Sequence, residues 1–123
     1  MKKLNLKKHK NACAVLALRH ISQLDEETVL RVCSTAGFDM ADGMLEEDII
    51  EAAADLGVTL EKIKYLRKLT LRDFKKKHPM GLFLILTFDH ALCVDNGLIY
   101  DPREIARGAG DRRIVWSAYR AVK

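Results

Sequence analysis

Apolar residues recur at spacings of three and four through the first half of the chain, which predicts three amphipathic helices. We expect them over about 12–22, 24–37 and 45–57, with Asn11 as the cap of the first. The second and third end at glycines, which favour the left-handed conformation that terminates helices. The predicted buried positions are Cys13, Leu16 and Ala17 in the first helix, Val29, Leu30, Val32 and Cys33 in the second, and Leu45, Ile49, Ile50, Ala53 and Leu56 in the third.

After the third predicted helix, the hydrophobic pattern is irregular at first and then predicts a short helix. Residues 58–65 alternate imperfectly between apolar and charged side chains, as an edge strand would. Thr70 followed three positions later by Asp73 is typical of a helix cap. A proline soon afterwards predicts that this helix has only one or two turns and ends near 78–79.

The last part of the chain is strand-like. Residues 81–94 are rich in Leu, Ile, Phe and Val, and the Asp-Asn-Gly sequence at 95–97 favours a hairpin turn before a short returning strand. Residues 113–122 predict a final strand, in which one ring of Trp116 and Tyr119 faces the core and the other faces solvent. We therefore predict an α+β fold in which N-terminal helices pack on a C-terminal antiparallel sheet.

Size and composition restrict the classes of protein that this chain can represent. Its 123 residues, 49% hydrophobic and 31% charged, predict a single domain over 1–123 with a basic lead-in at 1–10. Three widely spaced cysteines predict neither a disulfide framework nor a metal site, and they favour the reducing cytoplasm. The longest apolar run is too short to cross a membrane, so we expect no membrane association.

Charge is segregated along the chain. Residues 25–55 carry ten acidic side chains and only Arg31 as a base, whereas 62–78 carry eight basic side chains and only Asp73 as an acid. Such blocks can steer a charged partner, although a charge run is more often simply a solvated surface. The basic segment 62–78 is therefore a candidate surface for a protein or nucleic-acid partner.

Cys13 is the first candidate for chemistry. It falls in the first turn of a predicted helix, where unpaired backbone N–H groups and the positive end of the helix dipole stabilise a thiolate. The same N–H groups can bind an oxyanion. Taken alone, a cysteine here is more often a small buried hydrophobe, so a nucleophilic role needs a partner base.

His90 is the best candidate for that base, and Asp101 for the carboxylate that orients it. If 96–97 form a two-residue turn, Asp95 opposes Leu98, and His90 and Asp101 become diagonal neighbours on one face of the hairpin. A three-residue turn would move Asp101 to the opposite face.

The order of these elements resembles the papain-like cysteine peptidases. It is most similar to the small peptidase domains of bacteriocin-processing ABC exporters and their stand-alone relatives, in which a cysteine opens the first helix and a histidine strand is followed by an Asp-Pro element. The matching stretches are 11–18, the helix at 44–57 and the strand pair at 89–102.

The resemblance implies a papain-like fold and an acyl-transfer enzyme that cleaves peptide or isopeptide bonds without a metal or organic cofactor. Cys13 would be the nucleophile, His90 the general base and Asp101 the orienting residue. The family places a glutamine of the oxyanion hole six residues before the cysteine, where this chain has Lys7. Asn11 is then the candidate oxyanion donor.

The sequence also offers other residues for these roles and another function for the domain. His78 is a competing general base, Asn96 is a minor alternative to Asp101, and Cys33 and Cys93 are expected in the core. Without the upstream glutamine, the domain could also be a weak or inactive relative that works as a binding or inhibitory module. Phage-encoded or bacterial accessory proteins are the expected owners of such a domain.

Overall fold

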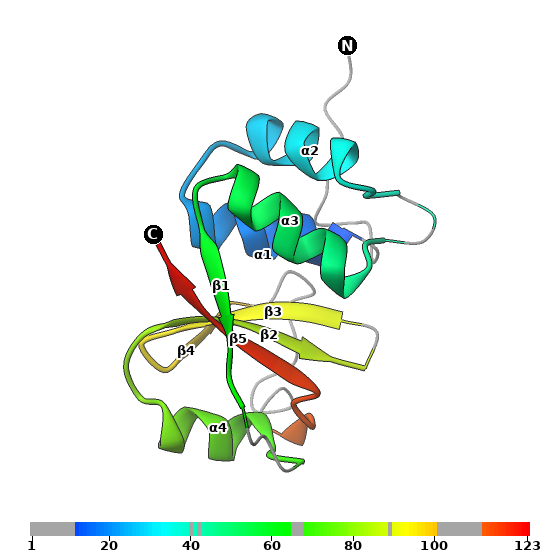
Figure 1. The fold of residues 1–123 in the computed structure, drawn as a ribbon. Helices are drawn as coiled ribbons and strands as arrows, with labels where there is room; N and C mark the ends of the chain where they lie inside the picture. Colours follow the sequence, from blue (N-terminus) through cyan, green and yellow to red (C-terminus); the bar gives the residue numbers. More distant parts are fainter. Residues whose placement is uncertain (1–11, 40, 42, 65–67, 89, 101–111) are drawn as a thin grey trace.

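One antiparallel sheet with helices on both faces makes up the computed structural model, which describes residues 12–123 except 40, 42, 65–67, 89 and 101–111. This part of the chain forms four helices and five strands in the order β1-β5-β2-β3-β4 (Figure 1). The α+β architecture expected from the sequence is therefore confirmed. The helices are α1 (Cys13–Ser22), α2 (Glu26–Thr35), α3 (Glu46–Asp55) and α4 (Leu71–Lys77), and the strands are β1 (Thr59–Lys62), β2 (Leu82–Thr87), β3 (His90–Asp95), β4 (Leu98–Tyr100) and β5 (Ser117–Val122).

Two of the helices begin at side chains that accept hydrogen bonds from the first turn. Asp25 Oδ2 accepts from the N–H of Thr28 at 3.1 Å, and Thr70 Oγ1 accepts from the N–H of Asp73 at 3.2 Å. The Thr28 hydroxyl, and then its backbone N–H, hold the pKa of Asp25 below its ordinary value. Both caps satisfy donors that a helix start leaves without an intrahelical partner.

Strand alternation divides the core into two clusters, one on each face of the sheet. The first cluster lies between the sheet and α1, α2 and α3, and the second lies between the sheet and α4 (Figure 1). From the sheet, the first contains Leu60, Leu84, Ala91, Cys93 and Tyr119, and the second contains Phe83, Ile85, Leu92, Val94 and Ala118.

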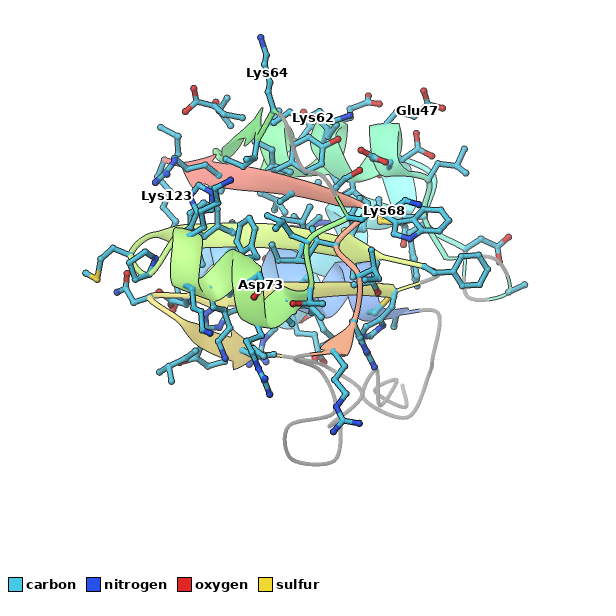
Figure 2. All side chains as sticks on the ribbon, turned by 90° about the horizontal axis from the view of Figure 1, so that it is seen from below. Glu47, Lys62, Lys64, Lys68, Asp73 and Lys123 are labelled. Carbon is cyan, nitrogen blue, oxygen red and sulfur yellow. The ribbon has the colours of Figure 1, made fainter. Side chains whose placement is uncertain are left out.

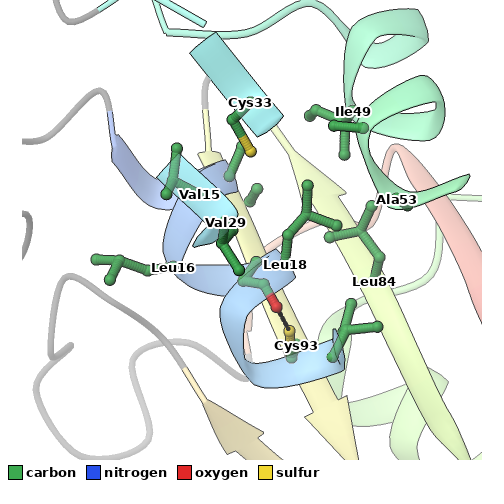
Figure 3. Close-up of a cluster of buried hydrophobic side chains, with 14 of the residues drawn as sticks. Val15, Leu16, Leu18, Val29, Cys33, Ile49, Ala53, Leu84 and Cys93 are labelled. Atoms are coloured by element: carbon green, nitrogen blue, oxygen red, sulfur yellow. Dashed lines mark hydrogen bonds between the residues drawn. The ribbon is translucent and has the colours of Figure 1, made fainter. Parts of the chain in front are cut away.

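Helix α1 lies along β3 and runs in the same direction. The Cys93 thiol donates to the carbonyl oxygen of Ala17 at 3.2 Å (Figure 3), and His20 Nε2 lies 3.1 Å from Asp95 Oδ2. Residues further along α1 thus contact residues further along β3. The two elements consequently begin at the same end of the molecule, the right-hand side of Figure 1.

Strands β1 and β4 form the two edges of the sheet. β1 has four residues and pairs only with β5, and β4 has three residues and pairs only with β3. Glu61 and Lys62 on β1 are exposed.

The structure corrects the expected strand boundaries. Residues 81–94 were expected as one strand-rich segment, but β2 ends at Thr87 and β3 begins at His90, so the segment folds back on itself around Phe88. The apolar run is long because both strands are covered on both faces, which removes the alternation that would have marked the break. The last strand begins at Ser117, later than predicted.

Residues 113–116 bend before the last strand instead of extending it. Val115 donates its N–H to the carbonyl of Leu69 at 2.8 Å, and Trp116 donates to the carbonyl of Leu86 at 2.9 Å. The expectation of one buried and one exposed ring is confirmed, because Tyr119 is 3% exposed and Trp116 is 63% exposed.

The Thr70 cap can be tested directly. Thr70→Ala should lower the free energy of unfolding by about 1 kcal/mol, because the N–H of Asp73 loses its acceptor. Urea denaturation measures this change. Thr70→Ser keeps an acceptor at the same place and is the matched control, so equal losses in both variants would contradict the capping role.

Candidate active site

Cys13 is the first residue of α1 and is half-buried. It packs at the margin of the cluster between α1–α3 and the sheet. Ala12 precedes it at the cap position, and an alanine side chain has no atom that can accept a hydrogen bond. Neither Glu nor Asp occurs in the first turn of α1. The helix start therefore provides the backbone donors and the positive dipole end that favour a thiolate.

His90 is the first residue of β3 and is 6% exposed. Its Nδ1 atom is buried. The ring borders a hollow of about 360 Å³ whose other lining residues are Thr87, Phe88, Arg113, Ile114 and Trp116.

The structure brings Cys13 and His90 to the same end of the molecule, because α1 and β3 begin together there. Ala91 belongs to the cluster beneath α1, whereas Leu92 belongs to the cluster beneath α4. Alternation along β3 therefore assigns His90 to the face of Leu92, opposite to the face that α1 covers. The catalytic contact between the thiol and the ring stays a prediction.

The predicted role of Asp101 requires a two-residue turn between β3 and β4, and the structure has one. Asp95 pairs with Leu98, and Asn96 and Gly97 both have positive φ, 49° and 84°. This two-residue turn is confirmed, and it matches the twist of the strands that it joins. The predicted helix cap at Asn11 is wrong, because the cap position of α1 is Ala12. Asp101 and Asn11 lie outside the described residues, so the orienting role of Asp101 and the oxyanion role of Asn11 are untested, as is the spatial relation of Lys7 to Cys13.

His78, the competing base, lies at the other end of the sheet. Its ring is 4.8 Å from that of Phe74 and 5.5 Å from that of Phe83, between centroids. Phe83 pairs with Val94, one residue before the end of β3. Burial, followed by the charges of Arg120 and Lys77, lowers the pKa of His78. This position separates His78 from the start of α1.

Cys33 and Cys93 are buried as expected, each with no exposed surface. Burial raises the pKa of Cys33 to about 12. Burial, and then the charge of Asp95, raises the pKa of Cys93 well above its ordinary value. Both thiols are therefore protonated near neutral pH, and neither is available as a nucleophile.

Asp95 and His20 have a role that the sequence did not indicate. Asp95 is predicted only as part of the turn, but its contact with His20 joins the end of β3 to the last turn of α1. The His20 ring also stacks on Tyr100, with 4.0 Å between centroids. No local pattern signals this contact, since 75 residues separate its partners.

The sequence also did not indicate that Phe88 and Trp116 lie together beside His90. Phe88 and Trp116 are 74% and 63% exposed, and their ring centroids are 5.4 Å apart. The only sequence signal is an aromatic residue at the point where the apolar run 81–94 breaks. Trp116 lies in the bend before β5. The sequence predicts this position as part of the last strand.

Among the described residues, no group of three or more His, Cys, Asp and Glu side chains could hold a metal ion. In the same part of the chain, no helix combines the length and the apolar character needed to cross a bilayer.

Comparisons of this chain with known protein families, with curated proteins and with solved structures gave no match.

The different burial of the three thiols predicts their reactivity. Iodoacetamide at pH 8 should leave Cys33 and Cys93 unmodified in the native protein and should modify both in urea, because only unfolding exposes them. Peptide mass spectrometry measures the modification of each residue. Native labelling of either thiol as fast as that of glutathione would contradict the core assignment.

Proposed function

We propose that the protein is a papain-like cysteine peptidase or a related acyl-transfer enzyme that works in the cytoplasm on peptide or isopeptide bonds. The observation that carries this proposal is the common end of α1 and β3, where the first residue of the helix is Cys13 and the first residue of the strand is His90. A reactive thiol and a histidine from distant parts of the sequence are the minimum that this chemistry requires.

The proposed reaction begins at Cys13. Its thiolate attacks the carbonyl carbon of the substrate, an S–C bond forms and the C–N bond breaks, and His90 as imidazolium gives its proton to the leaving amine. His90, now neutral, then takes a proton from a water molecule that attacks the thioester; the S–C bond breaks, the carboxylic acid leaves and the Cys13 thiolate is restored. Asp101 would orient the imidazole, and the first N–H groups of α1 would stabilise the oxyanion.

The proposal makes a structural demand on His90. Its ring must turn from the hollow beside Trp116 towards the start of α1. Thr87 and His90 are the last pair of β2 and β3 in the described part of the chain. Rotation about χ1 leaves Cβ of His90 on the α4 face, so the mechanism needs a backbone movement at the start of β3.

Alkylation kinetics test the pairing of Cys13 with His90. We expect iodoacetamide to modify Cys13 much faster than Cys33 and Cys93 at pH 7. His90→Gln should slow this reaction about tenfold or more, because each unit by which the thiol pKa rises lowers the thiolate fraction about tenfold. In the variant, fast labelling should require pH values above about 8.5.

His78→Gln is the matched control for this experiment, because it removes a histidine at the opposite end of the sheet. It should leave the labelling of Cys13 unchanged. Thermal unfolding of each variant separates a kinetic effect from loss of the fold. If His90→Gln and His78→Gln behave alike, the pairing is wrong.

A second experiment tests the acyl transfer itself. A peptidyl 4-nitrophenyl ester should acylate Cys13, releasing one nitrophenolate per thioester formed, and intact mass spectrometry should show the protein plus the acyl group. Cys13→Ala should abolish the adduct, whereas Cys33→Ala should keep it. An adduct that survives in Cys13→Ala would place the chemistry elsewhere.

A further inference from the structure

The outer side of α4 carries a concentration of positive charge. Leu71 and Phe74 are buried against the sheet, Arg72, Asp73, Lys76 and Lys77 are exposed, and Lys75 is half-buried. Figure 2 is seen from the side of this helix, with Asp73 labelled. Arg72 and Lys76 are four residues apart, so their side chains lie on the same side of the helix. The acidic residue among these positions is Asp73.

These cations line an open hollow next to the hairpin turn. The hollow has a volume of about 590 Å³, and Arg72, Lys75, Lys76, Pro79, Asn96 and Gly97 surround it. Asn96 Oδ1 accepts from the N–H of Gly81 at 2.8 Å, which turns the amide donor group away from that contact. The lining is therefore dominated by hydrogen-bond donors, as a phosphate group requires.

The exposed aromatic pair lies towards the opposite end of α4. The N–H of Leu71, the first residue of the helix, donates to the carbonyl of Arg113 at 2.8 Å. Arg113 lines the same hollow as Phe88 and Trp116. The six residues of β2 beneath the helix span about 20 Å. Cations and two exposed rings thus lie on the same side of the sheet.

A concentration of acidic side chains lies on the other side of the sheet. Helices α2 and α3 carry Glu26, Glu27, Glu46, Glu47, Asp48, Glu51 and Asp55, and Figure 1 shows these helices across the sheet from α4. An approaching polyanion is repelled from one side and attracted to the other. The charge distribution therefore orients such a partner onto α4.

We propose that the α4 side binds single-stranded nucleic acid, with phosphates at Arg72, Lys75 and Lys76 and a base stacked on the Phe88–Trp116 pair. A basic track combined with exposed rings is the arrangement with which proteins bind single strands, because every base offers a face for stacking. An acidic polypeptide would satisfy the cations but would give the two rings no comparable partner. This proposal does not depend on the chemistry of Cys13.

Fluorescence provides two independent measurements, because Trp116 is the only tryptophan of the chain. Fluorescein-labelled dT20 and rU20 should raise the anisotropy of the label, and unlabelled strands should quench Trp116 emission with the same midpoint. The affinity should fall steeply between 50 and 200 mM salt through counterion release. Comparing the two strands shows whether the sugar or the methyl group of the base matters.

Charge-reversal variants locate the binding surface. The double variant Arg72→Glu and Lys76→Glu should weaken binding by at least about tenfold, because two phosphate contacts are lost. Arg19→Glu with Arg31→Glu makes the same change in net charge on α1 and α2, and it should bind much more tightly than the α4 variant. Trp116→Ala should weaken binding of the labelled strand by about fivefold to a hundredfold, through lost stacking.

Several outcomes would overturn the proposal. Absence of binding at 50 mM salt would do so, as would equal losses in the two double variants. Polyglutamate that binds as tightly as dT20 without changing Trp116 emission would assign the surface to an acidic protein instead. Tighter binding of a duplex than of either single strand would also reject it. Cys13→Ala should leave all these measurements unchanged, which keeps this test separate from that of the proposed enzyme.

Discussion

The alignment of α1 with β3 is the constraint on which the candidate site depends. Two polar contacts set it within an otherwise apolar interface, the Cys93 thiol on the Ala17 carbonyl and the His20 ring on the Asp95 carboxylate. A shift of α1 by one turn would move Cys13 about 5.4 Å relative to β3. Such a shift would break both polar contacts and disturb the close packing of the core, so both effects hold the alignment.

Local sequence signals predicted those elements whose cause is local. The 3.6-residue periodicity indicated α1, α2 and α3, Thr70 and Asp73 indicated the cap of α4, and the Asn-Gly pair indicated a two-residue turn. In each case the determining atoms lie within a few residues of one another, so a short window of sequence contains the whole argument.

Contacts between distant segments could not be predicted in the same way. The break at Phe88 is hidden because both flanking strands are buried, and the hollow around His90 forms only when the bend at 113–116 packs beside it. Assigning Cys13 and His90 to one end of the molecule depends on the direction in which α1 crosses the sheet. Neither periodicity nor residue type specifies that direction. The side of the sheet that each residue faces depends on register as well.

The edges of the sheet have a consequence for how the protein behaves at high concentration. β1 offers only four residues, and the exposed Glu61 and Lys62 stand where another chain would have to add a strand. The β1 border, which is short and charged, disfavours the pairing of a strand from another molecule there. The hydrophobic run that supplies β2 and β3 would be hazardous on a border, yet β2 lies between β5 and β3, and β4 covers the last three residues of β3.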